Sequence, residues 1–406
     1  MQSDCIILGG GASGLAACAA LANAGMRITL IERLDRVGKK IMAAGNGRCN
    51  LSNENMDAAF YGKAAPFVKN VYSVTPPEEV LSFFDSLGLM TASEEGRIYP
   101  RTMMASSVLD VLRAPCEQAN VTLLTGQEAV SLTPSRRGGW SVQLAGGEGV
   151  FAPVVICAMG GSASAHLGTD GAGVRLLSAL GHRAEKQVPA LVQLRCDHGA
   201  LRSLKGVRVQ AALTLEIAQK AAAKENGELL FADYGVSGVC VFQLSGLAAK
   251  ALDEGKHVRL LVNLLPEISD ISGWFAARMN TRSAETALSL FTGVFPRLLT
   301  MAILKQAGIS PDTQVSRLRG AQIAALEEAI AAFPLPVTGT QGFKNAQVTR
   351  GGIHLDEVDP LTMASRLFDG LYILGETLDV DGPCGGYNLH FAFAGALTAA
   401  KAISNR

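Results

Sequence analysis

The sequence lacks an excess of charge of either sign, and this absence argues against several classes of function. Its 406 residues include 36 lysines and arginines and 36 aspartates and glutamates, so the formal net charge is zero. Proteins that bind nucleic acid or an anionic membrane over a broad surface normally carry a basic excess. We therefore expect a small-molecule substrate, and neither nucleic acid nor a membrane as a partner. The sequence leaves the oligomeric state open.

Long apolar runs and paired cysteines are also missing. No stretch of about 18 residues is apolar enough to cross a bilayer, and no signal-peptide pattern is visible. The eight cysteines are scattered without a CxxC pair, which argues against a disulfide framework, a zinc site and a dithiol centre. The histidines show no metal-ligand spacing, so we expect no metal site. Together these features favour a cytoplasmic protein with reduced thiols.

The composition that is present fits a compact α/β protein. Hydrophobic residues make up 48% of the chain, charged residues 18%, and glycine occurs 44 times. At roughly 150 residues per domain, this length allows two or three domains, each with its own core.

A glycine-rich turn near the start of the chain carries the first functional signal. It follows a short apolar strand, Ile6–Leu8, and opens an alanine-rich helix over Gly14–Ala24. The spacing satisfies GxGxxG, in which the glycines permit a tight turn, close approach to a pyrophosphate and close helix packing. The free N–H groups at the helix start would then bind phosphates. The residues of this turn are Gly9, Gly11, Ala12, Ser13 and Gly14.

A second strand, Arg27–Ile31, completes a βαβ unit and ends at a carboxylate. Glu32 stands 18 residues after Gly14, where an acidic side chain accepts hydrogen bonds from ribose hydroxyls. We count Arg33, the next residue, with the cofactor-binding set. The unit therefore predicts a bound dinucleotide, either NAD or FAD.

The end of the chain favours FAD. An apolar strand over Leu371–Leu374 leads into Gly375 and Glu376, and Gly385-Gly386 then opens a final helix. A strand-end carboxylate suits the ribityl hydroxyls, and a helix N-terminus suits the flavin pyrimidine. No second GxGxxG follows a strand, so we expect a single dinucleotide fold, with NAD(P)H as a possible transient electron donor.

The stretch "GKKIMAAGNGRCNLSN", residues 38–53, adds cations and small residues after the ribose carboxylate. Cationic side chains suit phosphates, and glycines allow close approach of the backbone. The candidates in this stretch are Lys39, Lys40, Gly47, Arg48, Cys49 and Asn50. Cys49, Tyr387 and His390 could also reach a substrate, but no side chain is assigned to catalysis.

The remaining pattern predicts a discontinuous α/β domain. Helices are expected over Pro76–Leu87, with Thr75 as N-cap, and over Ala105–Ala119. The apolar strand Val154–Ala158 ends at a turn containing Gly160. We expect the α/β domain to cover 1–187 and 342–406, a β domain 188–266 and 333–341, and a helical cap 267–332.

These motifs resemble the bacterial aminoacetone-oxidase-like, YhiN-like and BaiN-like family of NAD(P)/FAD-dependent oxidoreductases. The matching segments include "GGGASGLAAC", "GKKIMAAGNGRCNLSN", "GELLFADYGVSG" and "GLYILGETLDVDGPCGGYNLHFAFAGA", and they span nearly the whole chain. The resemblance implies a glutathione-reductase-like, Rossmann-type FAD domain, an inserted β-barrel-like domain and a helical cap. The residues it implies for noncovalent FAD binding are Glu32, Lys39, Lys40, the backbone near Val130, Glu376, Gly386, Tyr387, Asn388 and Leu389.

The chain departs from the family pattern at three positions. Asp233 stands where histidine is expected, Val239 where proline is expected, and Arg350 where a small residue is expected. All three lie in or near the insert or the return from it. They indicate either a changed substrate pocket or sequence drift, and they leave the prediction of FAD unchanged.

Three functions stay open. The first is reduction of a conjugated C=C–C=O substrate, with steroid-like enones as the example that BaiN-like relatives suggest, by NAD(P)H through FAD. The second is oxidation of a small, aminoacetone-like amine with O₂ as acceptor. The third is a flavin-binding protein without turnover.

Overall fold

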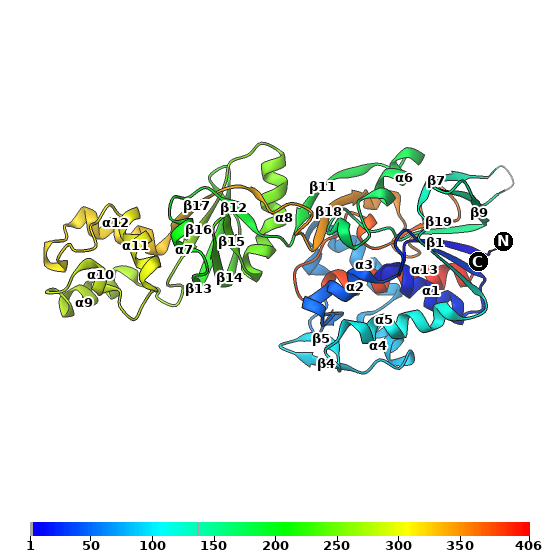
Figure 1. Cartoon of the computed structure of the whole chain (residues 1–406), viewed down its shortest axis with the longest axis horizontal. Helices are drawn as coiled ribbons and strands as arrows, with labels where there is room; N and C mark the ends of the chain where they lie inside the picture. The colour runs from blue at the N-terminus through cyan, green and yellow to red at the C-terminus, as the bar shows by residue number, and fades with distance from the viewer. Residues whose placement is uncertain (1–2, 136–137) are drawn as a thin grey trace. The chain divides into compact units, whose positions relative to one another are not determined.

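The computed structural model describes residues 3–135 and 138–406, and the chain divides into two compact units (Figure 1). The first unit comprises Met1–Gln187 and Val348–Arg406, and the second comprises Val188–Gln347. The return to the first unit therefore comes at Val348 and not at residue 342. Residues 342–347 stay with the second unit, where the backbone N–H of Gln347 donates to the Leu191 carbonyl at 3.3 Å. The division of the second unit into a β domain and a cap stays a prediction.

A parallel five-stranded sheet forms the centre of the first unit. Strand β1 (Cys5–Leu8) has β2 (Ile28–Glu32) on one side and β10 (Val154–Cys157) on the other, so the strand order reverses at β1. Ligands of open α/β sheets bind at such a reversal, beyond the carboxyl ends of the strands. In spatial order the strands are β19 (Leu371–Ile373), β10 (Val154–Cys157), β1 (Cys5–Leu8), β2 (Ile28–Glu32) and β6 (Val121–Thr125).

Two helices from opposite ends of the sequence pack together in this unit: α1 (Ala12–Asn23) and α13 (Tyr387–Ser404). Small side chains dominate both helices, and every residue from 390 to 400 in α13 is buried. Alanine and glycine permit this close packing, and the buried apolar area stabilises it by roughly 25 cal/mol per Å². The cofactor elements expected at the two ends of the chain thus share one core.

The rest of the first unit consists of short helices and small sheets. Its other helices are α2 (Lys39–Ala43), α3 (Ala65–Val74), α4 (Pro77–Ser86), α5 (Ala105–Arg113) and α6 (Ala172–Leu180). Its other strands are β3 (Ser52–Asn53), β4 (Thr91–Glu94), β5 (Arg97–Pro100), β7 (Ala129–Pro134), β8 (Trp140–Leu144) and β9 (Gly149–Ala152), and a further pair is β11 (Ala184–Ala190) with β18 (Val348–Ile353).

Two details of the helices differ from the sequence prediction. Thr75 does not cap α4, because its hydroxyl accepts a hydrogen bond from Thr398 at 2.9 Å and the residue before the helix is Pro76. The helix expected over Ala105–Ala119 ends at Arg113, and a 3₁₀ turn containing Pro115 follows. Proline lacks the N–H that would continue the α-helix.

The second unit contains a closed β-barrel and a set of helices between β16 (Val258–Asn263) and β17 (Phe333–Thr340) (Figure 1). This barrel and the parallel sheet of the first unit confirm the predicted fold class. Barrel residues alternate inward and outward; Ala211, Leu213 and Leu215 of β13 are buried. In order around the barrel the strands are β12 (Leu194–Cys196), β15 (Gly235–Ser237), β14 (Lys220–Ala232), β13 (Arg208–Ile217), β16 (Val258–Asn263) and β17 (Phe333–Thr340). The helices of the set are α9 (Ile271–Thr281), α10 (Ala287–Leu290), α11 (Arg297–Gln306) and α12 (Gly320–Ala331).

One long helix of the second unit was not predicted. Helix α8 (Val239–Asp253) packs against β14, although the sequence pattern of the region indicated strands. A short helix, α7 (Leu201–Leu204), lies before β13. Within residues 3–135 and 138–406, no helix combines the length and apolar character needed to cross a membrane.

Candidate functional site: a dinucleotide cleft in the first unit

The glycine-rich turn joins β1 to α1 and leaves its outer side open. A Cβ added to Gly14 would lie 1.9 Å from the carbonyl oxygen of Gly9, so the turn is closed tightly there. A Cβ added to Gly11 would meet nothing within 4 Å. Gly11 is also the N-cap of α1 and provides no side-chain hydrogen bond. The first N–H groups of the helix, at Ala12 and Ser13, are therefore available to a pyrophosphate.

Glu32 stands at the carboxyl end of β2, next to this turn, and its carboxylate is fixed in place. One carboxylate oxygen accepts from the backbone N–H of Gly10 at 2.8 Å, and the other accepts from Leu34 N–H at 2.8 Å. The residue is only 8% exposed. A carboxylate oxygen has a second lone pair, so Glu32 retains acceptor capacity for a ribose hydroxyl.

Lys40 and Glu376 lie against each other, although 336 positions separate them. The Lys40 ammonium is 2.6 Å from one Glu376 oxygen, and the other oxygen accepts from Thr349 N–H at 3.0 Å. Gly375 lies beside the glycine-rich turn, because a Cβ added to Gly375 would come 2.8 Å from Ser13 Oγ. These contacts bring the last strand of the sheet to the turn that follows the first.

Three other predicted cations are engaged elsewhere. Arg33 pairs with Asp170 at 2.9 Å, and Lys39 pairs with Asp35 at 2.6 Å. Arg48 contacts Glu94 and lies 4.2 Å above the ring of Tyr99. A phosphate would have to displace these acidic partners. Lys40 differs because its partner, Glu376, is itself a predicted cofactor residue.

The start of α13 is held by the loop that contains Asn50. Gly386 has a φ of 98°, and a Cβ there would lie 2.3 Å from the Ser52 carbonyl oxygen. When the Asn50 amide is oriented to donate to the carbonyls of Ser52 and Ile98, its oxygen accepts from Gly386 N–H at 3.1 Å. A different loop, residues 382–388, leads into the helix. Asn388 closes it by accepting from the backbone N–H of Gly382 at 2.8 Å and donating to the Gly382 carbonyl at 2.9 Å.

The helix that follows has no N-terminal side-chain cap. Because its N-cap is Gly386, the N–H groups of Tyr387, Asn388 and Leu389 have no acceptor within the helix. The positive end of this 18-residue helix therefore favours a negatively charged group next to its first turn.

The Cys49 thiol is not activated. Its side chain is fully buried, and burial raises the pKa of the thiol to about 12. A thiolate is the reactive form of cysteine, so the neutral thiol at this position has a packing role. Its backbone takes a positive φ of 57°, which gives the loop its tight shape.

A chain of phenol hydroxyls lies beside the start of α13, and no sequence motif signalled it. Tyr61 donates to the Tyr387 carbonyl at 2.8 Å and stands 2.7 Å from the Tyr72 hydroxyl. Since Tyr61 has one proton, Tyr72 donates to Tyr61. Burial raises the pKa of both phenols, which therefore stay protonated. The chain ends at a backbone carbonyl, so it orients the helix and does not relay protons.

His390 lies one turn into α13 and is completely buried. Its Nδ1 is 2.8 Å from Ser52 Oγ, and its Nε2 has no partner in the described parts of the chain. Burial lowers the pKa of His390 to about 3, so the ring is neutral near pH 7.

Two further predicted residues, Val130 and Gly160, lie where the backbone departs from regular geometry. Val130 sits at a bulge in β7, where the register passes from Ala129 to Ser131. Gly160 follows β10 with a φ of 74°, and a Cβ there would meet Thr169 Oγ1 at 2.9 Å.

Of the three departures from the family pattern, two have little effect on packing. Asp233 forms a 2.8 Å ion pair with Lys205 that is exposed to solvent. Val239 is the first residue of α8 and is 47% exposed, a position where proline is favoured but not required.

The third departure lies within the first unit. Arg350 Nε stands 3.0 Å from both oxygens of Asp381, in the segment that leads to α13. Two residues earlier, Asp379 pairs with Lys63 at 2.6 Å. These acidic residues were missed because nothing in the local sequence indicates their partners.

Together, the open side of Gly11, the fixed carboxylate of Glu32 and the uncapped start of α13 fit the phosphates, ribose and flavin ring of FAD. No cluster of histidine, cysteine and acidic side chains suited to a metal occurs in residues 3–135 and 138–406. All eight cysteines are free thiols, and seven of them are buried.

Comparison with protein families gives one match over nearly the whole chain. The model described as HI0933-like protein Rossmann domain matches residues 3–402.

Two curated relatives are similar over their full length. The 3-dehydro-bile acid delta(4,6)-reductase of Clostridium scindens is 40% identical over an alignment of 405 residues that covers 98% of each chain. The ribosomal RNA dihydrouridine synthase of Escherichia coli is 28% identical over 403 residues, covering 98% of this chain and 97% of that protein.

Among solved structures, the 3-ketosteroid delta1-dehydrogenase of Sterolibacterium denitrificans, in complex with 1,4-androstadiene-3,17-dione, is similar with a TM-score of 0.52. The match covers 100% of this chain and 99% of that chain at 14% sequence identity, so it supports the fold alone.

Proposed function

The chain belongs to the HI0933-like family of FAD-dependent oxidoreductases, and on this premise we propose that it reduces a C=C bond conjugated to a carbonyl in a small, steroid-like enone. The net reaction consumes NAD(P)H and a proton and yields the saturated ketone and NAD(P)⁺. The observation that carries the proposal is the 40% identity, over 98% of both chains, to a 3-dehydro-bile acid delta(4,6)-reductase.

The second relative points to the same type of bond. Dihydrouridine differs from uridine by two hydrogens added across a ring C=C that is conjugated to a carbonyl. Both named relatives therefore saturate an activated alkene, while differing in the molecule that carries it. This shared chemistry favours alkene reduction over oxidation of a small amine.

Bound FAD would supply the hydride acceptor and donor for this reaction. The residues of the first unit bind and orient it in the proposal. The N–H groups at Ala12 and Ser13 and the Lys40 ammonium would hold the phosphates, and Glu32 would accept from the ribose. Glu376 is the candidate for the ribityl hydroxyls.

The start of α13 contributes electrostatics. The N–H groups of Tyr387, Asn388 and Leu389 place partial positive charge where the pyrimidine ring would lie. Tyr61 and Asn50 hold this helix start through the carbonyl of Tyr387 and the N–H of Gly386. The neutral His390 behind them adds no charge.

Stopped-flow absorbance of the holoenzyme under anaerobic conditions tests the proposal. NADH or NADPH is expected to bleach the flavin absorbance, and a Δ4- or Δ4,6-3-ketosteroid is expected to restore it. Since the sequence contains one dinucleotide motif, donor and acceptor should use the same flavin face in turn, which predicts ping-pong kinetics.

Two results would contradict the proposal. Bleaching by a small amine with none by either nicotinamide, followed by reoxidation by O₂ with stoichiometric peroxide, would establish the amine oxidase instead. Very slow reduction by every donor would indicate a flavin-binding protein without turnover.

The identity of the enone needs a separate comparison. Ribosomal RNA transcripts containing uridine, offered beside the ketosteroid, test whether the substrate resembles that of the E. coli relative. The zero net charge of the chain favours the small molecule. Flavin reoxidation by RNA but not by the steroid would keep alkene reduction and overturn the substrate class.

A further inference from the structure

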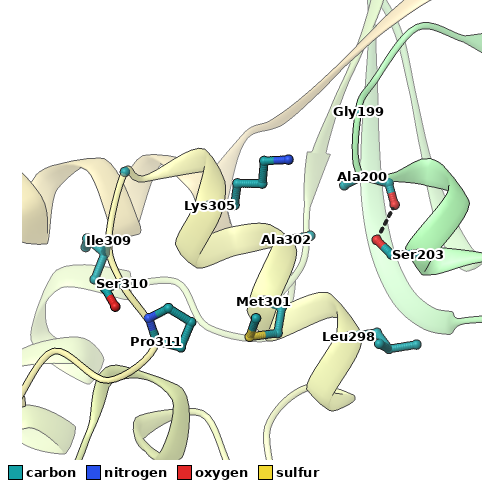
Figure 2. Close-up of a pocket in the computed structure, with 11 residues that line it drawn as sticks. Gly199, Ala200, Ser203, Leu298, Met301, Ala302, Lys305, Ile309, Ser310 and Pro311 are labelled. Atoms are coloured by element: carbon teal, nitrogen blue, oxygen red, sulfur yellow. Dashed lines mark hydrogen bonds between the residues drawn. The ribbon is translucent and has the colours of Figure 1, made fainter.

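A pocket of about 620 Å³ lies within the second unit, and none of its lining residues is assigned to FAD (Figure 2). One wall is α11 together with the turn that follows it, and the other is the segment leading into α7. The volume falls in the range of about 300–1,000 Å³ that is common for small-molecule sites. The lining residues are Gly199, Ala200, Ser203, Leu298, Met301, Ala302, Lys305, Gly308, Ile309, Ser310 and Pro311.

Helix α11 has two apolar faces, and only one of them is covered. Leu299 and Ile303 are fully buried in the core of the second unit. Leu298 and Met301 line the pocket and are 48% and 40% exposed. An amphipathic helix normally presents polar residues on its outer face, so apolar side chains beside a hollow indicate a ligand surface.

The opposite wall is built from small residues that leave the hollow open. Ser203 Oγ donates to the carbonyl of Ala200 at 2.7 Å, so its hydroxyl is engaged in its own helix turn (Figure 2). The backbone N–H of Ala200 donates to His198 Nδ1 at 3.2 Å. These local bonds engage the Ser203 hydroxyl and the Ala200 N–H, and Ala200 lines the pocket at the edge of the buried core.

The pocket lining includes one charged side chain, that of Lys305. Lys305 stands one turn after Met301 on α11, and Figure 2 shows its side chain extending towards the wall that carries Ala200. It is the sole charged residue of the lining, and it is exposed to solvent. A cation beside an apolar surface complements a molecule with an apolar body and one acidic group.

We propose that this pocket binds an amphipathic monocarboxylate, with the apolar body on Leu298, Met301 and Ile309 and the carboxylate beside Lys305. The site shares no residue with the proposed FAD cleft and does not depend on the proposed reaction. Two sources share the required chemistry: a steroid with a carboxylate side chain and a long-chain fatty acid.

Isothermal titration calorimetry of the holoenzyme tests the proposal with cholate and laurate as probes. Saturable binding of either probe supports the site, and the better probe identifies the source. Dodecanol, which has the laurate chain without the charge, is expected to bind more weakly than laurate.

Variants locate the binding. Ala200→Leu should fill the pocket and weaken the better probe at least tenfold, with flavin content and kcat/KM unchanged. Lys305→Gln should weaken it about two- to fivefold, the range expected for one partly exposed ion pair. Lys344→Gln, which removes an exposed cation outside the lining, is the matched control and should leave the affinity unchanged.

Three results would overturn the proposal. The first is the absence of saturable binding by either probe. The second is equal binding by wild type, Ala200→Leu and Lys305→Gln. The third is a concentration-dependent dimer in sedimentation velocity that Met301→Lys dissociates, since a second copy would then cover this surface.

Discussion

Lowering the pH from about 7.5 to 5.0 should destabilise the first unit through a single side chain, His390. Burial lowers the pKa of this histidine to about 3, compared with 6.5 in an exposed chain. Because the folded pKa lies below the unfolded one, the unfolded chain takes up the proton more readily. The stability due to the neutral ring is therefore complete above pH 6.5 and is lost as the pH falls towards 3.

The expected loss follows from the two pKa values. At pH 5 the unfolded histidine lies about 1.5 units below its pKa, while the folded ring is still neutral. At about 1.4 kcal/mol per unit, the free energy of unfolding should fall by about 2 kcal/mol. Carboxylates with lowered pKa values, such as Glu357, lose their contribution mainly at lower pH, so most of that loss lies below this window.

The fluorescence of one tryptophan can report the first unit alone. The chain has two tryptophans: Trp140 is buried in β8, and Trp274 lies in α9 of the second unit. In a Trp274→Phe background, urea unfolding followed at Trp140 gives the stability of the first unit. The same titrations are run with His390→Gln at both pH values and at equal, saturating FAD.

The comparison of the two proteins decides the outcome. His390→Gln removes the titrating ring, so its loss of stability between the two pH values should be about 2 kcal/mol smaller. Effects shared by both proteins, such as a pH-dependent FAD affinity, cancel. Equal losses in the two proteins would refute the assignment of a neutral, buried ring at this position.

Three further predictions concern the cofactor cleft. Glu32→Ala should weaken FAD binding by roughly 1.5–3 kcal/mol, or about 10- to 150-fold, because the ribose and two backbone N–H groups lose an acceptor. Fluorescence titration of the apoprotein with FAD measures this affinity, and an unchanged value would show that the ribose lies elsewhere. Gly11→Val should retain the circular dichroism spectrum and lose FAD, whereas Gly14→Val should not fold, because only the valine at position 14 would collide with the backbone. Similar behaviour of the two variants would contradict the open side at Gly11. Iodoacetamide at about pH 8 should leave the Cys49 thiol unmodified until the protein unfolds. Mass spectrometry of the peptide that contains Cys49 measures the labelling, and rapid labelling of the folded protein would mean that the thiol is activated.

The sequence predicted the parts of the cleft that are local in the chain. The glycine turn, Glu32 at the end of the next strand and the helix after Gly386 are each defined by neighbours within about 30 residues. Which residues pair with one another could not be predicted. Lys40 and Glu376 were both expected to hold FAD, but their ion pair joins positions 336 apart.

The errors have the same physical origin. Thr75 has the composition of an N-cap, yet tertiary packing directs its hydroxyl to Thr398. Helix α8 was missed because its residues lie between barrel strands, and its position depends on β14. The phenol chain of Tyr61 and Tyr72 depends on how α3 meets α13, and no local pattern encodes that contact.

The placement of β19 and α13 after the second unit in the sequence has a consequence for biosynthesis. The second unit is a continuous segment, Val188–Gln347, and can fold while the ribosome is still at work. The first unit has to wait, because its sheet lacks an edge strand and α1 lacks its packing partner until residues 371–404 have been synthesised. We therefore expect FAD binding to follow the synthesis of α13, and a nascent chain stalled before residue 371 should retain a folded barrel and no flavin.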